Sequence, residues 1–93
     1  MEIRLNNTIQ RDPELMSSKL DNEVVLLSIN NGKYYKIDEV GAGIWEKIEN
    51  PTKVDEICKM MAKEYEVDVE ECQQDTFNFL QQLLKDNLIS IIQ

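Results

Sequence analysis

An Asn-Asn-Gly turn between two apolar runs, within residues 23–48, constrains the fold of this chain more than any other feature. Asn and Gly tolerate the positive φ angles of tight hairpin turns, so the flanking runs predict antiparallel strands over residues 23–29 and 33–37. The first run is apolar on both alternating faces, which is typical of a strand covered on both sides or partly covered by a partner. The second run carries adjacent tyrosines, Tyr34 and Tyr35, whose side chains must point to opposite faces of the sheet.

A third strand is predicted just ahead of this hairpin. Residues 15–20 form a short, weakly apolar run, and Asp21-Asn22 supplies the turn that joins it to the next strand. The three strands together predict an antiparallel meander. Residues 1–13 show only a brief apolar alternation that ends at Pro13, so they are either a loose first strand or a disordered tail.

The first of three predicted helices follows the meander. Asp38 is placed to cap its N-terminus, and Asn50-Pro51 ends it. Gly41 and Gly43 each cost about 1 kcal/mol relative to Ala in a helix interior, which indicates a backbone packed tightly against another element. The predicted apolar stripe consists of Val40, Ile44, Trp45 and Ile48.

Two further helices follow with clear amphipathic spacing. Thr52 and Asp55 resemble a capping box at the start of the second helix, and Asp68 is placed to cap the third. Asn87 can adopt the left-handed conformation that ends the third helix, and residues 88–92 either form a short final strand or pack under that helix. The core faces are Val54, Ile57, Cys58, Met61, Ala62 and Tyr65 on the second helix and Cys72, Thr76, Phe79, Leu80, Leu83 and Leu84 on the third.

Strands followed by helices along 93 residues predict a single α+β domain, spanning residues 1–93, with three helices against one face of a three-stranded antiparallel sheet. The short turn between the second and third helices is typical of a helix-turn-helix pair, as in winged-helix proteins.

Composition argues against several function classes. The chain contains no histidine, the usual general base near neutral pH and the commonest metal ligand. Cys58 and Cys72 lack the neighbours that would complete a zinc site, so we expect them to be buried, reduced apolar residues. We therefore expect no catalytic residue, no metal and no cofactor.

Charge and hydropathy narrow the class of partner. The net charge is −8, and residues 68–86 carry five acidic residues against one lysine, which is the wrong sign for a helix that reads DNA. No apolar run is long enough to span a bilayer, and no signal peptide is recognisable, so the sequence predicts a cytoplasmic protein.

A peptide is the partner that the remaining features favour. Residues 33–37 end the meander, so one edge of that strand is expected to be unpaired, and a free edge invites strand addition by an extended peptide. On one flank of the third helix, polar side chains lie next to apolar ones. The polar residues are Asp75, Asn78 and Gln82, and the apolar residues are Phe79 and Leu83. The alternatives are simple β-propensity for the tyrosines and an ordinary solvated face for the helix flank.

An ordered series of segments resembles the PqqD-like family, whose members are recognition elements for the precursors of ribosomally made, post-translationally modified peptides (RiPPs). The series comprises residues 25–37, 40–46, 54–57 and 65–68, followed by Asp75, Phe79, Leu80, Leu83, Leu88 and Ile89. It covers about residues 15–90. The chain has Ile37-Asp38 where the family usually has Leu-Asn, and Asn87 where Gly is common.

The resemblance implies that a leader peptide adds as an antiparallel strand to the third strand, with its apolar side chains in a groove against the third helix. The implied peptide-binding residues are Lys33, Tyr34, Tyr35, Lys36 and Ile37 on the strand and Asp75, Thr76, Phe79, Gln82 and Leu83 on the helix.

Within the family, the short acidic form resembles the stand-alone proteins of lasso-peptide pathways. This implies that the leader is presented to a separate transglutaminase-like leader protease and a cyclase. The alternatives are a leader-binding role beside a radical-SAM enzyme, as in PQQ or sactipeptide pathways, and a winged-helix regulator.

Overall fold

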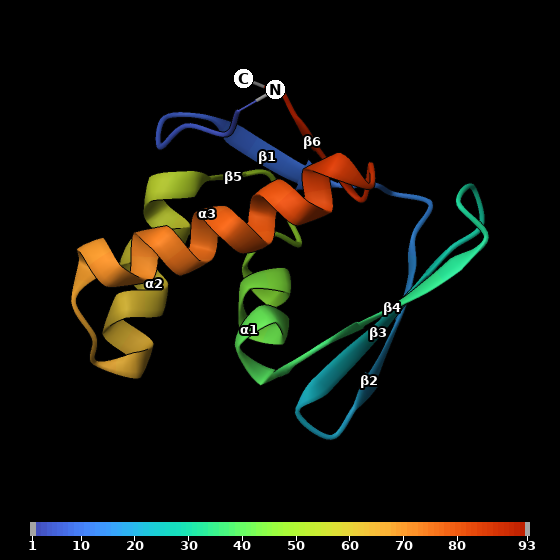
Figure 1. Ribbon diagram of the computed structural model, residues 1–93, viewed down its shortest axis with the longest axis horizontal. Coiled ribbons are helices and arrows are strands. Elements are labelled where there is room, and N and C mark those ends of the chain that lie inside the picture. The colour runs from blue at the N-terminus through green and yellow to red at the C-terminus, as the bar shows by residue number, and fades with distance from the viewer. Residues whose placement is uncertain (1, 93) are drawn as a thin grey trace.

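The computed structural model describes residues 2–92, which combine two three-stranded antiparallel sheets with three helices (Figure 1). The predicted order of a three-stranded sheet followed by three helices is confirmed, and the second sheet was not predicted. No helix within this range is long and apolar enough to cross a membrane. The first sheet consists of β2 (Met16–Leu20), β3 (Glu23–Ser28) and β4 (Lys33–Ile37). The helices are α1 (Glu39–Lys47), α2 (Val54–Tyr65) and α3 (Val69–Lys85). The second sheet consists of β1 (Thr8–Arg11), β5 (Thr52–Lys53) and β6 (Ile89–Ile91).

The second sheet joins segments that lie far apart in the sequence. β1 is its central strand, with β5 on one side and β6 on the other, and both pairings are antiparallel (Figure 1). Ile9 of β1 is fully buried. The N-terminal segment therefore contains a strand at Thr8–Arg11. For the C-terminal apolar run, the sequence left open a short strand or packing under the third helix, and the structure shows the strand. Both strands are too short for a local pattern to specify, because their stability depends on distant partners.

The central hairpin has the predicted antiparallel pairing and one buried face. Leu26 pairs with Tyr35 and Val24 with Ile37, so these four side chains share the face that packs on α1. The opposite face is open: Tyr34 is 76% exposed there. Within residues 2–92, β3 is therefore covered on the helix side alone, and partial cover of its other face by a partner stays a prediction.

Asp38 caps α1 as predicted. Position 41 of the same helix has no room for a side chain, which explains the glycine found at that position. The Asp38 Oδ1 atom accepts a hydrogen bond from the Gly41 backbone N–H at 2.9 Å. A Cβ on Gly41 would overlap the Ile37 side chain and lie 2.9 Å from Phe79. At Gly43 the prediction of tight packing is wrong, because a Cβ there would meet its nearest neighbour at an ordinary 3.6 Å.

We expect Asp38→Ala to lower the free energy of unfolding by about 1 kcal/mol, because α1 loses its only side-chain N-cap bond. Asp38→Asn keeps an acceptor at the same position and should change stability by only a few tenths of a kcal/mol. Urea denaturation followed by circular dichroism measures both. Equal stability of the two variants would contradict the capping role.

Two other expectations at helix N-termini need correction. Val40 is 46% exposed on the first turn of α1, so it does not belong to the core stripe. Thr52 does not cap α2: it lies in β5, and its hydroxyl is the donor toward the carbonyl oxygens of Lys47, the last residue of α1, and Asn50. The N-cap position is Lys53, without a side-chain bond. The first N–H groups of α2 donate instead to the carbonyl oxygens of residues 5 and 7, both at 3.0 Å.

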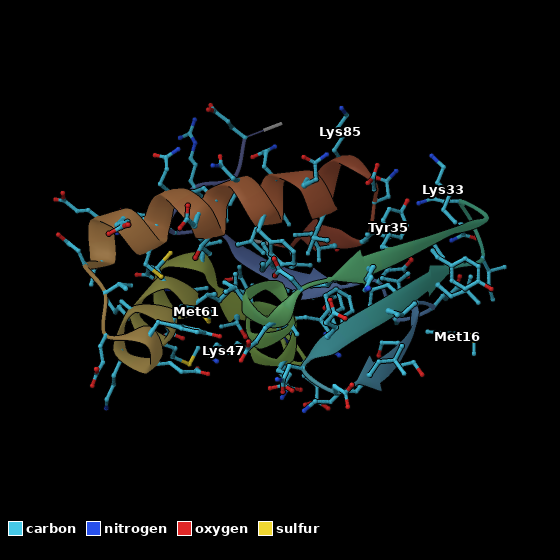
Figure 2. All side chains as sticks on the ribbon, turned by 60° about the horizontal axis from the view of Figure 1, so that its bottom comes forward. Met16, Lys33, Tyr35, Lys47, Met61 and Lys85 are labelled. Carbon is cyan, nitrogen blue, oxygen red and sulfur yellow. The ribbon has the colours of Figure 1, made fainter. Side chains whose placement is uncertain are left out.

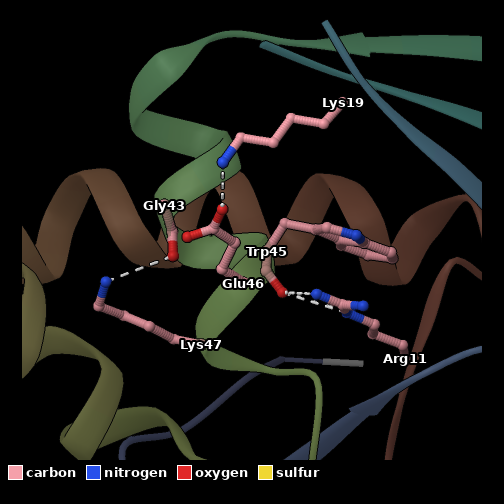
Figure 3. Close-up of polar contacts among 6 residues, drawn as sticks. All are labelled: Arg11, Lys19, Gly43, Trp45, Glu46 and Lys47. Atoms are coloured by element: carbon pink, nitrogen blue, oxygen red, sulfur yellow. Dashed lines mark hydrogen bonds and ion pairs between the residues drawn. The ribbon is translucent and has the colours of Figure 1, made fainter. Parts of the chain in front are cut away.

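Helix α1 is the element that both sheets hold. Arg11 of β1 lies over the Trp45 ring, 4.3 Å from its centroid, and donates to the Trp45 carbonyl oxygen (Figure 3). Burial lowers the pKa of Arg11 from its ordinary value, while Glu49 and Glu46 act in the opposite direction. From the other sheet, Lys19 of β2 contacts Glu46 at 3.2 Å, an exposed pair of small energetic value (Figure 3).

The two cysteines are buried and unpaired, as predicted. Cys58 is fully inaccessible in α2, and burial is the main cause that raises the pKa of its thiol. Cys72 packs on the facing side of α3, with its sulfur 3.9 Å from the hydroxyl of the buried Thr76. Both residues therefore serve the core between these helices.

Candidate functional site

The free strand edge that the sequence predicts is present on β4. All five residues of β4 pair with β3, and within residues 2–92 no strand pairs with the other edge of β4. Figure 2 shows Tyr35 on the side of β4 that faces α3. An extended segment placed along this edge would therefore continue the sheet toward α3 and contact both elements.

The structure separates the roles of the two tyrosines. Tyr35 is half-buried against the core, and its hydroxyl accepts a hydrogen bond from Asn31 Nδ2 at 3.2 Å. The same Nδ2 donates to the carbonyl oxygen of Asp86, the C-cap of α3, at 2.9 Å. The hairpin turn is thus tied to the end of α3 beside Tyr35. Tyr34 points to the open face of the sheet, away from α3.

The residues predicted on α3 do not form one surface. Thr76 and Leu83 are 1% and 5% exposed, so they belong to the floor beneath any groove. Phe79 is half-buried and packs against the core, while Asp75 and Gln82 are exposed. Asp75, Thr76 and Phe79 border one cavity, and Gln82 borders another.

The predicted strand residues differ in a similar way. Lys33 and Lys36 are exposed along β4, and Lys36 forms an exposed ion pair with Glu23 at 3.5 Å. Ile37 is 5% exposed and packs against Gly41 at the start of α1. The backbone of β4, rather than a cluster of its side chains, is therefore the feature common to these positions.

A cavity of about 450 Å³ opens between α1, α2 and α3, and sequence reasoning did not find it as a site. Its apolar wall includes Ile44, Met61, Cys72 and Phe79, and three carboxylates also line it: Asp38, Glu71 and Asp75. Of its lining residues, only Asp75, Thr76 and Phe79 were among the predicted site residues. Asp38 was recognised solely as a helix cap, because nothing in the local sequence indicates that the start of α1 meets the middle of α3.

The cavity has an acidic character. The ion pairs in residues 2–92 join Lys19 to Glu46, Lys36 to Glu23 and Lys47 to Glu64, so none of them neutralises a carboxylate of the cavity. Tyr65 lines one side, and burial, followed by the charges of Glu64 and Glu39, raises the pKa of its phenol. The described residues contain no group of three or more His, Cys, Asp or Glu side chains that could hold a metal ion.

A second, more open cavity of about 650 Å³ lies along the C-terminal half of α3. Lys85 is the only charged residue in its lining. Most of the lining consists of side-chain amides, from Asn78, Gln81, Gln82 and Asn87. The Gln81 side chain accepts a hydrogen bond from the Ile3 N–H at 3.1 Å, so part of this surface holds the N-terminal segment in place.

A family model and several solved structures are similar to this chain. A family model described as coenzyme PQQ synthesis protein D (PqqD) matches residues 23–89. A structure described as TbiB1 in complex with the TbiA(beta) leader peptide is 32% identical, covers 87% of this chain and 94% of its own, and superposes with a TM-score of 0.81. No curated protein sequence matches the chain with comparable significance.

Two more distant structures share the fold. A lasso peptide synthetase B1 complexed with the leader peptide is 20% identical, over 88% of this chain and 96% of its own, with a TM-score of 0.77. The solution structure of the PqqD truncation of Methylobacterium extorquens PqqCD, described as a stand-alone RiPP recognition element, is 13% identical over 95% and 94% of the two chains, with a TM-score of 0.79.

Proposed function

We propose, because the chain belongs to the PqqD family, that it binds the leader segment of a ribosomally made precursor peptide and itself catalyses no reaction. The observation that carries the proposal is the unpaired edge of β4, which faces α3. The TbiB1 relative, at 32% identity, is described in complex with a leader peptide, which supports the same class of ligand here.

Strand addition would supply part of the affinity through backbone hydrogen bonds, and the leader side chains held in the groove would supply the preference for the leader. Each backbone hydrogen bond to β4 contributes about 0.5–1.5 kcal/mol net. One or two buried apolar side chains of the peptide would add roughly 1.5–3 kcal/mol each, before the cost of ordering the peptide is subtracted. A dissociation constant between nanomolar and micromolar follows from these terms.

The ten candidate residues take different parts in this proposal. The five residues of β4 offer their backbone edge, and Tyr35 forms one wall of the groove. Phe79 forms the facing wall on α3, and the buried Thr76 and Leu83 support it from beneath. Asp75 and Gln82 would contact the two ends of the bound peptide, since they lie two helical turns apart on α3.

We further propose that the bound leader is presented to a separate leader protease and a cyclase in lasso-peptide biosynthesis. The resemblance of this short acidic chain to the stand-alone proteins of these pathways supports this role. In such an arrangement the chain contributes binding energy that raises the local concentration of the precursor at the partner enzyme.

Titration with a synthetic leader peptide encoded beside the gene tests the proposal. We expect saturable binding by calorimetry or fluorescence anisotropy, with a Kd between nanomolar and micromolar. The core half of the same precursor is the control and should not bind. Equal binding of leader and core, or binding of neither by protein that circular dichroism shows to be folded, would contradict the function.

A further inference from the structure

The acidic cavity begins where the free edge of β4 ends. Ile37 is the last residue of β4, and Asp38, the next residue, lines the cavity. Gly41 also lines it, and the absence of a side chain there lets Ile37 and Phe79 approach the α1 backbone. A peptide that runs along β4 and continues beyond Ile37 therefore reaches this cavity without a break.

The lining specifies the chemistry of the side chain that fits. The wall formed by Ile44, Met61 and Phe79 is apolar, and Asp38, Glu71 and Asp75 add three carboxylates. No basic residue lines the cavity, and none of its carboxylates belongs to an ion pair within residues 2–92. A side chain with an aliphatic stem and a cationic head satisfies both parts, because the stem packs on the wall while the head meets the acids.

The aromatic rings at the cavity favour the same class of side chain. Tyr65 and Phe79 both line it, and the face of an aromatic ring attracts a cation electrostatically. A bound metal ion is not the occupant that this geometry indicates, since the described residues offer no cluster of ligands that could hold one.

Strand polarity decides which part of the peptide reaches the cavity. β4 runs from Lys33 to Ile37, so a peptide paired antiparallel to it runs from the Ile37 end toward the Lys33 end. The residues that precede its strand-forming segment then lie at the cavity.

We propose that this cavity receives a lysine or arginine side chain of the leader peptide, located N-terminal to the segment that pairs with β4. The inference rests on the proposed function and deepens it by assigning a second subsite and its charge preference. The β4 edge and its groove would recognise the extended backbone and apolar side chains of the leader, whereas the cavity would add a preference for leaders with a basic residue at one place.

The protein side of the test removes the charges and keeps the shapes. The double variant Glu71→Gln/Asp75→Asn should weaken binding of the synthetic leader by about threefold to tenfold, because each exposed charge pair contributes modestly. Glu56→Gln/Glu70→Gln removes the same net charge at exposed positions outside the cavity and should stay within about twofold. The difference between the two doubles should shrink at high salt.

The peptide side identifies the occupant. Each Lys or Arg that precedes the strand-forming segment is replaced by Met, which keeps the apolar stem and removes the charge. One replacement should cause the same loss as the cavity double variant, and the two losses should not add when variant and peptide are combined. That non-additivity shows that both changes act on one contact.

Three outcomes would overturn the inference while the proposed function stands: unchanged leader binding by the cavity double variant, fully additive losses, or a leader that binds but has no basic residue before its strand-forming segment. Absence of any leader binding by the folded parent protein is a different result. It would overturn the proposed function, and this inference with it.

Discussion

Tyr35→Ala is expected to weaken leader binding by about thirtyfold or more, whereas Tyr34→Ala should change it by less than about threefold. Tyr35 is half-buried on the side of β4 that faces α3, where a bound peptide would cover it (Figure 2). Buried aromatic side chains at the centre of an interface commonly contribute more than 2 kcal/mol each. Tyr34 is 76% exposed on the opposite face of the sheet, so a peptide at the β4 edge leaves its ring in solvent.

Tyr35→Phe separates the ring from its hydroxyl. This variant loses the hydrogen bond from Asn31 but keeps the wall of the groove, so its affinity should stay within about threefold of the parent. Calorimetric titration of all three variants with the same leader, after circular dichroism confirms their fold, completes the measurement. Equal losses for the two alanine variants would place the peptide elsewhere.

Gly41→Ala should lower the free energy of unfolding by about 2 kcal/mol, even though Ala is the better helix former. The added methyl group would overlap the Ile37 side chain and approach Phe79 to 2.9 Å, and a branched side chain such as that of Ile37 has little room to move. Gly41 also lies in the first turn of α1, where the gain in helix propensity is smallest. Urea denaturation measures the change.

Gly43→Ala is the matched control two residues along the same helix. Its new Cβ would meet the flexible end of Met61 at 3.6 Å, an ordinary contact, so this variant should be neutral or more stable by up to about 1 kcal/mol. Opposite signs for the two variants would confirm that the close approach of α1 to β4 and α3 requires Gly41. A loss of stability at both positions would indicate a general intolerance of α1 to side chains.

The features predicted correctly from sequence are those that neighbouring residues specify. The Asn-Asn-Gly turn sets the hairpin, with Gly32 at a φ of +65°. Asp38 and Asp68 cap the helices that follow them, through bonds to N–H groups two or three residues away. Asn87 adopts the left-handed conformation after α3. Each of these depends on side chains within a few positions in the chain.

The incorrect predictions concern features that depend on contacts between segments far apart in the chain. The capping box at Thr52 was wrong because β5 pairs with β1, some forty residues earlier, and backbone carbonyls of that N-terminal segment cap α2 instead. The second sheet was missed because its strands span two to four residues each, too few for alternation to be distinguished from loop. Val40 follows the periodicity of the core stripe, yet it lies at the open cavity between the helices and stays 46% exposed.

The amino-acid sequence alone determined the hairpin, the three helices, the absence of histidine and the family. Turn residues and apolar periodicity depend only on neighbouring positions in the chain, and composition does not depend on the fold. Tertiary structure alone decided which tyrosine faces α3, which glycine is irreplaceable, and that carboxylates from α1 and α3 line one cavity. Those properties depend on distances between elements that are thirty to forty residues apart in the chain. Such distances follow from how the helices and both sheets pack together, and no local sequence pattern encodes them.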